Sequence, residues 1–330
     1  MAHPETERLD VFMARANAAY YATRDPFADF TTAPEISQVF GEVLGLWSAV
    51  MWTMIGRPAP VRLIEVGPGR GTLMADALRA IRRAMPAFGE ALRVDLVETS
   101  PRLRAIQAAA VPDANWHDRL EDVPDGPFTL LANEFLDALP IRQFVRRSDG
   151  WAERFVGPAG FAEQPADILP WPEPLPEGAI VERSDAAAAI AALVADRLAR
   201  APGAALFLDY GPEHSAPGDS LQALSGGVPV DPLSPPGTAD LTAHVDFAAF
   251  SRAAWAGGAK AHGPVPQGLF LARLGLFQRA NRLAQGRPPA EASAIMESAR
   301  RLGEPNRMGR LFKALAVTRG DIDALPGFVD

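Results

Sequence analysis

The chain has 330 residues, of which 48% are hydrophobic, and a formal net charge of −8 at pH 7. This length suits one large domain, with or without insertions. The acidic balance argues against nucleic acid or an anionic membrane as a partner, because phosphate binding requires a basic surface. The sequence has no cysteine, which excludes disulfides, thiolate metal sites and cysteine nucleophiles.

The N-terminal stretch MAHPETERLDVF has no apolar run of signal-peptide length and is too acidic for a transit peptide. No window approaches the roughly 18 consecutive apolar residues of a membrane span. Only Lys260 and Lys313 are lysines, so arginine supplies 30 of the 32 basic residues, a bias that fits a GC-rich genome. We therefore expect a bacterial, cytoplasmic protein that does not insert into membranes.

Residues 1–60 are expected to form a helical segment that acts as a lid. Residues 10–22 carry apolar side chains at helical spacing. A long second helix is predicted from about Pro34 to Gly56. Proline suits a first helical turn, and Thr32 stands where a capping hydroxyl would.

From residue 61 to residue 330, predicted strands alternate with predicted helices, which implies a parallel sheet with helices on its faces. The strands are expected at residues 62–66, 92–98, 114–118, 127–133, 204–211 and 312–318. The helices are expected at residues 72–85, 100–110, 184–203, 247–258, 268–286 and 289–303. Two insertions, around residues 141–182 and 211–300, interrupt this α/β domain.

Inside the insertions, residues 141–156 alternate in polarity on both sides of Ser148-Asp149-Gly150, a pattern typical of a hairpin. Residues 157–179 are rich in proline and glycine and are expected to be irregular. Residues 212–240 are expected to form a loop.

The stretch RLIEVGPGRGT, residues 62–72, places three glycines between a predicted strand and a predicted helix. Gly67, Gly69 and Gly71 leave backbone N–H groups uncovered at the start of that helix, where a dinucleotide or S-adenosylmethionine could bind. The dinucleotide pattern requires glycine at its sixth position, which is Thr72 in this chain. A tight turn without a ligand is the simpler alternative.

Two acidic residues favour an adenosyl cofactor that lacks a diphosphate. Glu65 precedes the glycines by two residues, where a carboxylate would repel a pyrophosphate but suits a sulfonium cofactor that carries an ammonium. Glu98 ends the next strand, where a carboxylate can accept hydrogen bonds from both ribose hydroxyls. The acid of a dinucleotide site lies about 20 residues after the glycines. The separation is larger in this chain, which weakens that alternative without excluding it.

Eight stretches, in consistent order along nearly the whole chain, resemble the MidA-like methyltransferases. They are DFTTAPEISQVFGE (29–42), IEVGPGRGTLMADALR (64–79), VETSPRLRAIQ (97–107), ANEFLDALPIRQF (132–144), GDSLQALSGG (218–227), ADLTAHVDFAAF (239–250), QGLFLARLG (267–275) and MGRLFKALA (308–316). The resemblance implies an α/β, Rossmann-like class I methyltransferase fold with a mostly parallel seven-stranded sheet and added helical and hairpin elements. It also implies S-adenosyl-L-methionine as the cofactor.

The chain departs from this family around RDPFADF, residues 24–30. Family members usually have a longer loop there that ends in Gly-Asp-Phe, and in this chain Ala28 replaces the glycine. The departure falls on the lid that is expected to close over the cofactor.

Mitochondrial members of the family are complex I assembly factors that methylate a protein arginine. The guanidinium of arginine stays protonated, so carboxylates that orient it and offset its charge would assist the reaction. Glu134 and Asp137 follow a predicted strand and are predicted to grip the substrate from one helix face. The alternative is that Glu134 caps the following turn and Asp137 pairs with Arg142.

Eight other side chains are candidates for the site. Three of them are Asp209 and Tyr210, which end the predicted strand at 204–211, and Asp246, which could instead cap the following helix. Asn133 is expected beside the methionine part of the cofactor, His117 beside the adenine, and Thr32 and Glu35 over the cofactor. His244 could act as a general base, although a structural role is the simpler alternative. The histidines are scattered and none pairs with a second ligand at helical spacing, so we expect no metal site.

The leading hypothesis is a protein-arginine N-methyltransferase whose partner, as the resemblance implies, is a core subunit at the quinone site of respiratory complex I. The rival hypotheses are a small-molecule methyltransferase, a non-catalytic assembly factor with a residual cofactor pocket, and a nicotinamide oxidoreductase. The sequence does not determine the oligomeric state or the degree of methylation.

Overall fold

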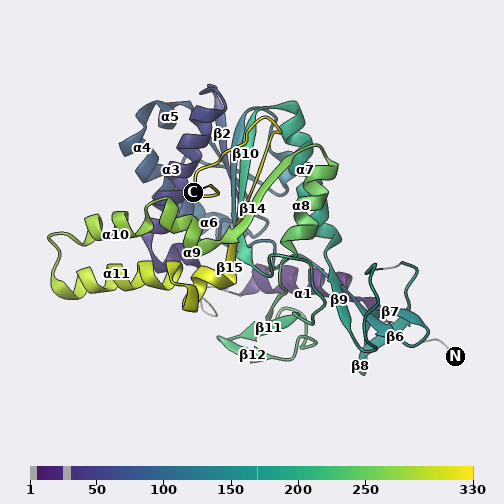
Figure 1. The fold of residues 1–330 in the computed structure, drawn as a ribbon. Coiled ribbons are helices and arrows are strands. Elements are labelled where there is room, and N and C mark those ends of the chain that lie inside the picture. Colours follow the sequence, from purple (N-terminus) through teal and green to yellow (C-terminus); the bar gives the residue numbers. More distant parts are fainter. Residues whose placement is uncertain (1–5, 25–30, 169, 330) are drawn as a thin grey trace.

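The computed structural model describes residues 6–24, 31–168 and 170–329. Its centre is a seven-stranded sheet (Figure 1). The strand order is β14-β15-β10-β5-β2-β3-β4. The strands are β2 (Val61–Val66), β3 (Leu92–Val97), β4 (Asn115–His117), β5 (Phe128–Asn133), β10 (Gly203–Tyr210), β14 (Lys260–Pro266) and β15 (Phe312–Thr318). β15 lies antiparallel to both of its neighbours, and the pairs from β10 to β4 are parallel. The predicted mostly parallel, seven-stranded sheet is confirmed.

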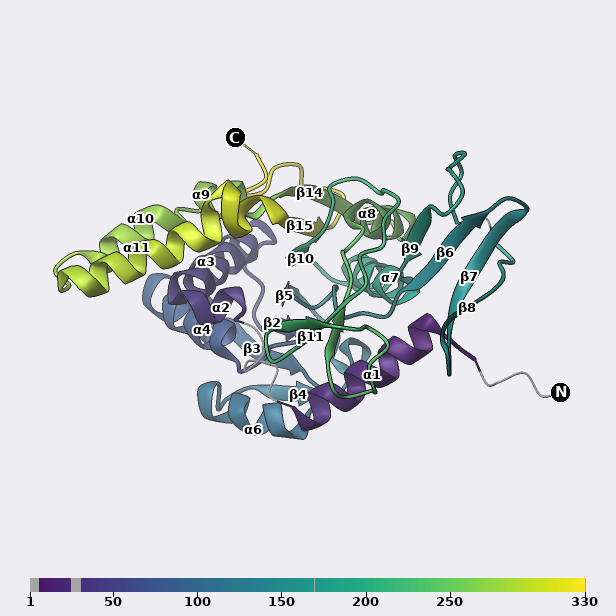
Figure 2. The same cartoon turned by 90° about the horizontal axis from the view of Figure 1, so that it is seen from below.

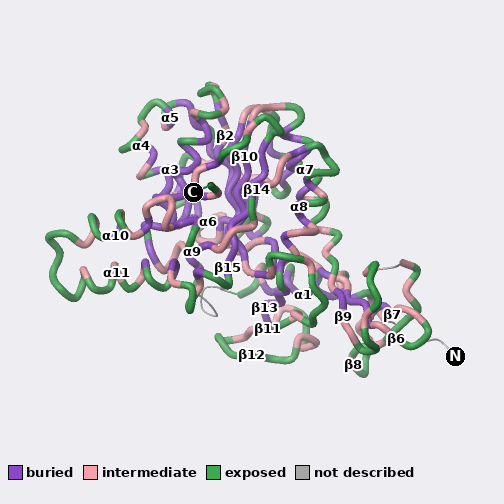
Figure 3. Tube along the Cα trace, in the orientation of Figure 1, coloured by how far each residue is buried: buried purple, intermediate pink, exposed green. Residues whose placement is uncertain are grey.

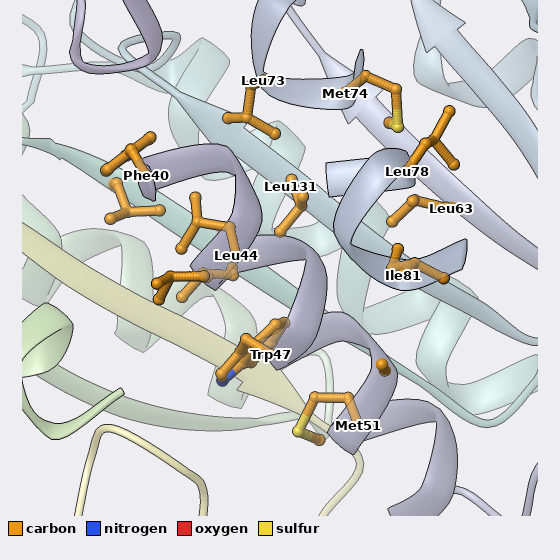
Figure 4. Packing of buried hydrophobic residues seen from close by; sticks show 14 of the residues in the cluster. Phe40, Leu44, Trp47, Met51, Leu63, Leu73, Met74, Leu78, Ile81 and Leu131 are labelled. Atoms are coloured by element: carbon orange, nitrogen blue, oxygen red, sulfur yellow. The ribbon is translucent and has the colours of Figure 1, made fainter. Parts of the chain in front are cut away.

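Helices α3 (Gln38–Met54) and α4 (Thr72–Ala84) cover one face of the sheet. Figure 4 shows their apolar side chains interlocking above Leu63 and Leu131 of the sheet. The two helices approach closely because α3 presents Gly45, where a Cβ would lie 2.6 Å from the Cα of Ala77 in α4. The burial of this apolar surface is the main stabilising contribution to the fold.

Helices α7 (Asp185–Arg200) and α8 (Phe247–Ala256) cover the opposite face. Phe207 of β10 meets Phe250 of α8 edge to face, with ring centroids 4.7 Å apart. Ser184 caps α7 by accepting the N–H of Ala187 at 3.0 Å. Helices α5 (Pro86–Ala91) and α6 (Pro101–Ala110) complete the units between β2 and β4.

Two smaller sheets flank the central one. One contains β1 (Glu7–Arg8), β6 (Arg142–Arg147), β7 (Gly150–Gly157), β8 (Gly160–Pro165) and β9 (Ile180–Arg183), and the other contains β11 (Gln222–Ser225), β12 (Val228–Val230) and β13 (Asp240–Thr242). The predicted hairpin is confirmed as β6 and β7. The irregular segment predicted at 157–179 is wrong in part, because β8 extends the hairpin, and the loop predicted at 212–240 contains β11 and β12.

Two predicted helices are each interrupted. The helix expected from Pro34 is split into α2 (Ala33–Ile36) and α3, since Ser37 is extended and its side chain caps α3. The helix expected at 268–286 is split into α9 (Gln267–Arg273) and α10 (Leu276–Ala284) at Gly275, whose φ is +90°.

The remaining helices lie at the ends of the molecule. Helix α1 (Leu9–Thr23) runs along one edge of the core, and α10 and α11 (Pro289–Gly303) project as an arm on the side opposite β6–β8 (Figure 2). The outer part of the arm is largely exposed, whereas the central strands are buried (Figure 3). A 3₁₀ turn (Leu120–Asp122) follows β4, and a π turn (Pro305–Gly309) follows α11. No helix in the described ranges is both long and apolar enough to cross a bilayer.

Candidate functional site

A cavity of about 510 Å³ opens at the carboxyl ends of β2, β3, β4 and β5. Helices α1 and α2 cover it. Four of the predicted segments meet in its lining, namely the glycine turn, the end of β3, the end of β5 and the start of α2. Because open α/β sheets bind ligands at the carboxyl ends of their strands, this cavity is the candidate cofactor site.

The glycine turn joins β2 to α4 with a backbone that only glycine adopts easily. Gly67, Gly69 and Gly71 have φ values of +67°, +55° and +81°. A Cβ on Gly67 would lie 3.2 Å from the ring of Phe135. Gly71 stands at the start of α4 with no capping side chain of its own. In the first turn Glu65 accepts the N–H of Met74, and the N–H groups that precede it face the ligand side of the turn.

Glu65 lies beneath the glycine turn with only 3% of its surface exposed. Its carboxyl accepts the backbone N–H of Met74, and Oε2 has no hydrogen-bond partner among the described residues. Burial raises the pKa of this carboxyl to about 8. A buried oxygen without a partner in a cavity wall indicates that a ligand donor, such as an ammonium, completes the site.

Glu98 lies at the end of β3 and lines the same cavity. Its Oε1 accepts the N–H of Ser100 at 2.8 Å, and its Oε2 accepts the side-chain amide of Gln107 at 3.2 Å. Burial raises the pKa of this carboxyl as well. The carboxylate is therefore held in place, and its remaining lone pairs can accept hydrogen bonds from ligand hydroxyls.

Asn133 and Glu134 lie on the cavity wall at the end of β5. Glu134 Oε1 accepts the N–H of Ala33 in α2 and the side-chain amide of Asn133, each at 3.0 Å. Burial raises the pKa of the Glu134 carboxyl, and its backbone is left-handed, with a φ of +50°. The predicted cap of the following turn is wrong, because Glu134 holds the start of a helix 101 residues earlier in the chain.

Asp137 lies close to Glu134, but the segment between them is a turn and not the helix that the prediction assumed. Asp137 does not line the cavity. Burial, followed by the charge of Glu134, raises the pKa of Asp137 to about 7. The alternative pairing with Arg142 is also wrong, since Arg142 pairs with Glu153 at 2.6 Å and Asp185 at 3.4 Å.

Asp209 at the end of β10 anchors this turn. Its Oδ2 accepts the backbone N–H groups of Phe135, Leu136 and Asp137 at 3.1, 2.9 and 3.2 Å. Burial raises the pKa of Asp209. Glu134, Asp137 and Asp209 thus form a buried acidic cluster, and none of the three makes an ion pair within the described part of the chain.

Helices α1 and α2 contribute lining residues that the sequence analysis missed in part. Asn17 of α1 bonds both Ala138 and Leu241, and the hydroxyl of Tyr21 donates to Asp240 at 2.8 Å. Asn17 lies four residues after Met13, on the same buried face of the helix. A polar residue on an apolar helix face is the sequence signal that points to a buried hydrogen bond.

Thr32 and Glu35 both line the cavity, as expected. Thr32 makes no side-chain capping bond to α2, so the capping role predicted for its hydroxyl is wrong. Glu35 Oε1 accepts the hydroxyl of Thr72 at the start of α4, which links α2 to the glycine turn.

The structure does not bring His117 or His244 to this cavity. The ring of His117 pairs with the buried Asp95 at 2.8 Å, so it turns into the sheet, and the following residues 118–121 line the cavity instead. His244 lines a separate cavity of about 660 Å³ beyond β10, where its backbone N–H donates to Ser220. The expected positions of both histidines are corrected accordingly.

In the described ranges, no group of three or more His, Asp or Glu side chains could hold a metal ion. The arrangement instead defines an α/β protein with an adenosyl-cofactor site, in which a glycine turn lies between two buried carboxylates. Residues 43–265 match the protein family described as "Putative S-adenosyl-L-methionine-dependent methyltransferase". The chain belongs to this family, the MidA-like S-adenosylmethionine-dependent methyltransferases.

Relatives of known name agree with this assignment. The chain is 33% identical over 363 residues to the protein arginine methyltransferase NDUFAF7 homolog of Drosophila melanogaster, covering 97% of this chain and 82% of that protein. It is 34% identical to mouse NDUFAF7 over 90% of this chain and 77% of that protein. A Burkholderia thailandensis crystal structure with bound S-adenosyl-homocysteine is 29% identical and has a TM-score of 0.83, covering 98% of this chain and 90% of that one.

The residues of this chain fit S-adenosylmethionine. The unpartnered Oε2 of Glu65 and the glycine turn provide an acceptor and open N–H groups for the amino-acid part of the cofactor. The unpartnered Glu65 oxygen does not suit a diphosphate, because a diphosphate has no N–H donor to offer it. The predicted cofactor is confirmed.

Proposed function

We propose that this chain is a protein-arginine N-methyltransferase whose acceptor is a core subunit at the quinone site of respiratory complex I. The observation that carries the proposal is the acidic cluster of Glu134, Asp137 and Asp209, which has no ion-pair partner in the described ranges. A buried group of carboxylates is costly unless a cation neutralises it. A guanidinium from an acceptor would supply that cation, and the named relatives are protein arginine methyltransferases.

For the cofactor, we assign Gly67, Gly69 and Gly71 to its amino-acid end and Glu65 to its ammonium. Glu98 would accept the ribose hydroxyls. Asn133 would lie beside the methionine part, with Thr32 closing the cavity from α2. When bound, S-adenosylmethionine supplies a methyl group on a positively charged sulfur.

For the acceptor, we assign the grip on the guanidinium to Glu134, which lines the cavity. Its Oε1 is held by Ala33 and Asn133, which leaves Oε2 to accept hydrogen bonds from the acceptor. Glu134 also takes up the proton that the acceptor nitrogen loses, as its raised pKa allows. Asp137 does not line the cavity, and it contributes by adding negative charge next to Glu134. His244 is left out of this assignment because it lies in the other cavity.

We further propose that residues 1–60 act as the lid of a methyltransferase domain formed by residues 61–330, and that the protein works in the bacterial cytoplasm. The stretch that departs from the family, residues 25–30 with Ala28, lies outside the described residues. Asn17, Tyr21 and Thr32 belong to the proposed lid and line the cavity, which supports this division.

Mass spectrometry of complex I subunits, purified from cells with the gene, without it, and with the Glu134→Gln variant, tests the proposal. We expect one arginine to gain the mass of one or two methyl groups only in cells with the unaltered gene. If the subunits carry no such arginine while the purified protein methylates a small molecule, the acceptor is wrong. If the Glu134→Gln cells assemble complex I normally, a non-catalytic assembly factor is favoured instead.

A further inference from the structure

Gln107 of α6 is completely buried between two parts of the cofactor site. Its side-chain NH₂ donates to the carbonyl of Gly69 at 2.7 Å and to Glu98 Oε2 at 3.2 Å. It therefore bridges the glycine turn that follows β2 and the carboxylate that follows β3. Gln107 does not itself line the cavity.

A third contact fixes which end of the amide faces which neighbour. The indole N–H of Trp116 in β4 donates to Gln107 Oε1 at 2.9 Å. Because an indole N–H can only donate, it must face the amide oxygen, and the NH₂ must then face Gly69 and Glu98. All the hydrogen-bonding groups of this buried side chain are therefore used.

We propose that Gln107 is a positioning residue that holds the Glu98 carboxylate in the orientation that recognises the cofactor ribose. Glu98 is fixed from one side by Ser100 and from the other by Gln107. Without Gln107, the carboxylate could rotate and the carbonyl of Gly69 would lose its donor. This inference rests on the ribose role proposed for Glu98, and it is independent of the methyl acceptor.

A purely structural role for Gln107 predicts a different outcome. If the side chain only fills space beside Gly71, where a Cβ would lie 3.5 Å from the Cγ of Gln107, its loss should weaken the binding of all ligands of the cavity equally. A positioning role predicts that its loss selectively reduces discrimination for the ribose hydroxyls. The ratio of affinities for two ligands that differ in one hydroxyl separates these roles.

The experiment measures binding of S-adenosylhomocysteine and of its 3′-deoxy analogue by isothermal titration calorimetry. The proteins are the unaltered chain, Gln107→Leu, Trp116→Phe and Glu98→Gln. A hydrogen bond to a charged carboxylate should give the unaltered chain an affinity ratio of about 10 or more. We expect the ratio to fall below about 3 in Gln107→Leu and to take an intermediate value in Trp116→Phe.

The matched control is Gln267→Leu. Gln267 is also fully buried, does not line the cavity, and donates its amide to a backbone carbonyl, but that carbonyl belongs to Leu302, at 3.0 Å, and not to the glycine turn. This variant should lower the thermal unfolding temperature and keep the ratio of the unaltered chain. If Gln107→Leu fails to fold, the milder Trp116→Phe decides the outcome.

An unchanged ratio in the folded Gln107→Leu variant would overturn the proposal. An unchanged ratio in Glu98→Gln would show that Glu98 does not bind the ribose hydroxyls. That result would contradict both this inference and the cofactor assignment of Glu98. Neither result would bear on the identity of the acceptor, which the mass spectrometry tests separately.

Discussion

The wall around the glycine turn and the wall at the ends of β5 and β10 hold their carboxylates in different ways. Glu65 and Glu98 stand on the first wall, and their protein partners lie within about one α/β unit of chain. On the second wall, Glu134 accepts the N–H of Ala33, which lies 101 residues earlier in the chain. Asp209 accepts N–H groups of the turn at 135–137, which lies up to 74 residues earlier. The first wall is built from neighbouring segments, and the second is assembled from distant ones.

The two walls therefore suit different ligands. Two separated carboxylates suit a ligand whose polar groups are spread out, such as an amino-acid end and a ribose. Three carboxylates in one cluster, with burial raising each pKa, suit a single cation that enters from outside. The first wall, which we call the cofactor wall, would then bind the cofactor. The second, which we call the acceptor wall, would select and activate the acceptor.

The largest effect is expected from Glu134→Gln, which tests whether the two walls have different roles. The variant keeps the shape and one acceptor oxygen for Ala33 but loses the charge, so we expect methyl transfer to fall by about 10²- to 10⁴-fold with little change in cofactor affinity. Single-turnover mass spectrometry on the authentic acceptor, with calorimetry alongside, measures both. Glu121→Gln, at an exposed residue that also lines the cavity, is the matched control. Full activity of Glu134→Gln would remove our catalytic assignment.

The next largest effect is expected on the cofactor wall, from Gly69→Val. A β-branched residue at a φ of +55° is strained, so the turn must shift to relieve the strain and displace its N–H groups. We expect the affinity for S-adenosylhomocysteine to fall by about 100-fold. This fall corresponds to a free-energy cost near the upper end of the range for such backbone strain. Gly89→Ala in α5 is the control, because its Cβ would meet only ordinary contacts, the nearest at 3.5 Å. Equal binding by both variants would contradict the assignment of the turn.

A smaller effect concerns pH and Glu65. The carboxyl holds its proton up to a pH of about 8, whereas the contact proposed for it with the ammonium of the cofactor requires the carboxylate. Binding should therefore release a proton, and affinity should rise by up to about tenfold per pH unit between pH 6 and 8 and flatten above. Calorimetry in buffers of different ionisation enthalpy detects the proton, and Glu65→Gln should abolish the dependence.

The same variant offers an independent check through stability. A raised pKa stabilises the fold fully below the ordinary value of 4.5, and that contribution is lost as pH rises through about 8. Relative to Glu65→Gln, the unaltered chain should therefore become less stable to urea from pH 5 to pH 8. A constant difference across this interval would mean that the carboxyl is already ionised in the folded protein.

The smallest effect is expected from His244→Ala. His244 is exposed and lies in the 660 Å³ cavity, beyond the wall that carries Glu134. We expect less than about a twofold change in cofactor affinity and turnover, as is usual for surface substitutions. A large loss of turnover without a loss of cofactor affinity would instead place the acceptor in that second cavity and redraw the acceptor wall.

Much of the cofactor wall could be predicted because its signals are local. Glu65, the glycines and Glu98 lie at junctions of predicted strands and helices, and the periodicity of hydrophobic residues locates such junctions. The acceptor wall was predicted less well. The sequence pointed to Glu134 and Asp137, but it did not reveal that Glu134 has a left-handed backbone, that a turn follows it, or that Asp209 anchors this turn.

The missed strands have a similar physical cause. β11 and β12 are short, and β8, β11 and β12 all lie in segments rich in glycine and proline. Their order comes from partner strands that local propensity does not reveal. The break between α2 and α3 depends on the extended backbone of Ser37, and an apolar stripe continues across it. His117 was misplaced because only the fold reveals that Asp95 is its partner.

Helix α1 has a consequence for the synthesis of the protein. Its Asn17 accepts the N–H of Leu241 at 3.0 Å, 224 residues later in the chain, and its apolar face packs on residues of the same late region. At about 5 to 20 residues per second, a ribosome needs roughly 10 to 45 s to make that stretch. For that interval helix α1 has an apolar face without its partner, so we expect nascent chains to be the form most dependent on chaperones.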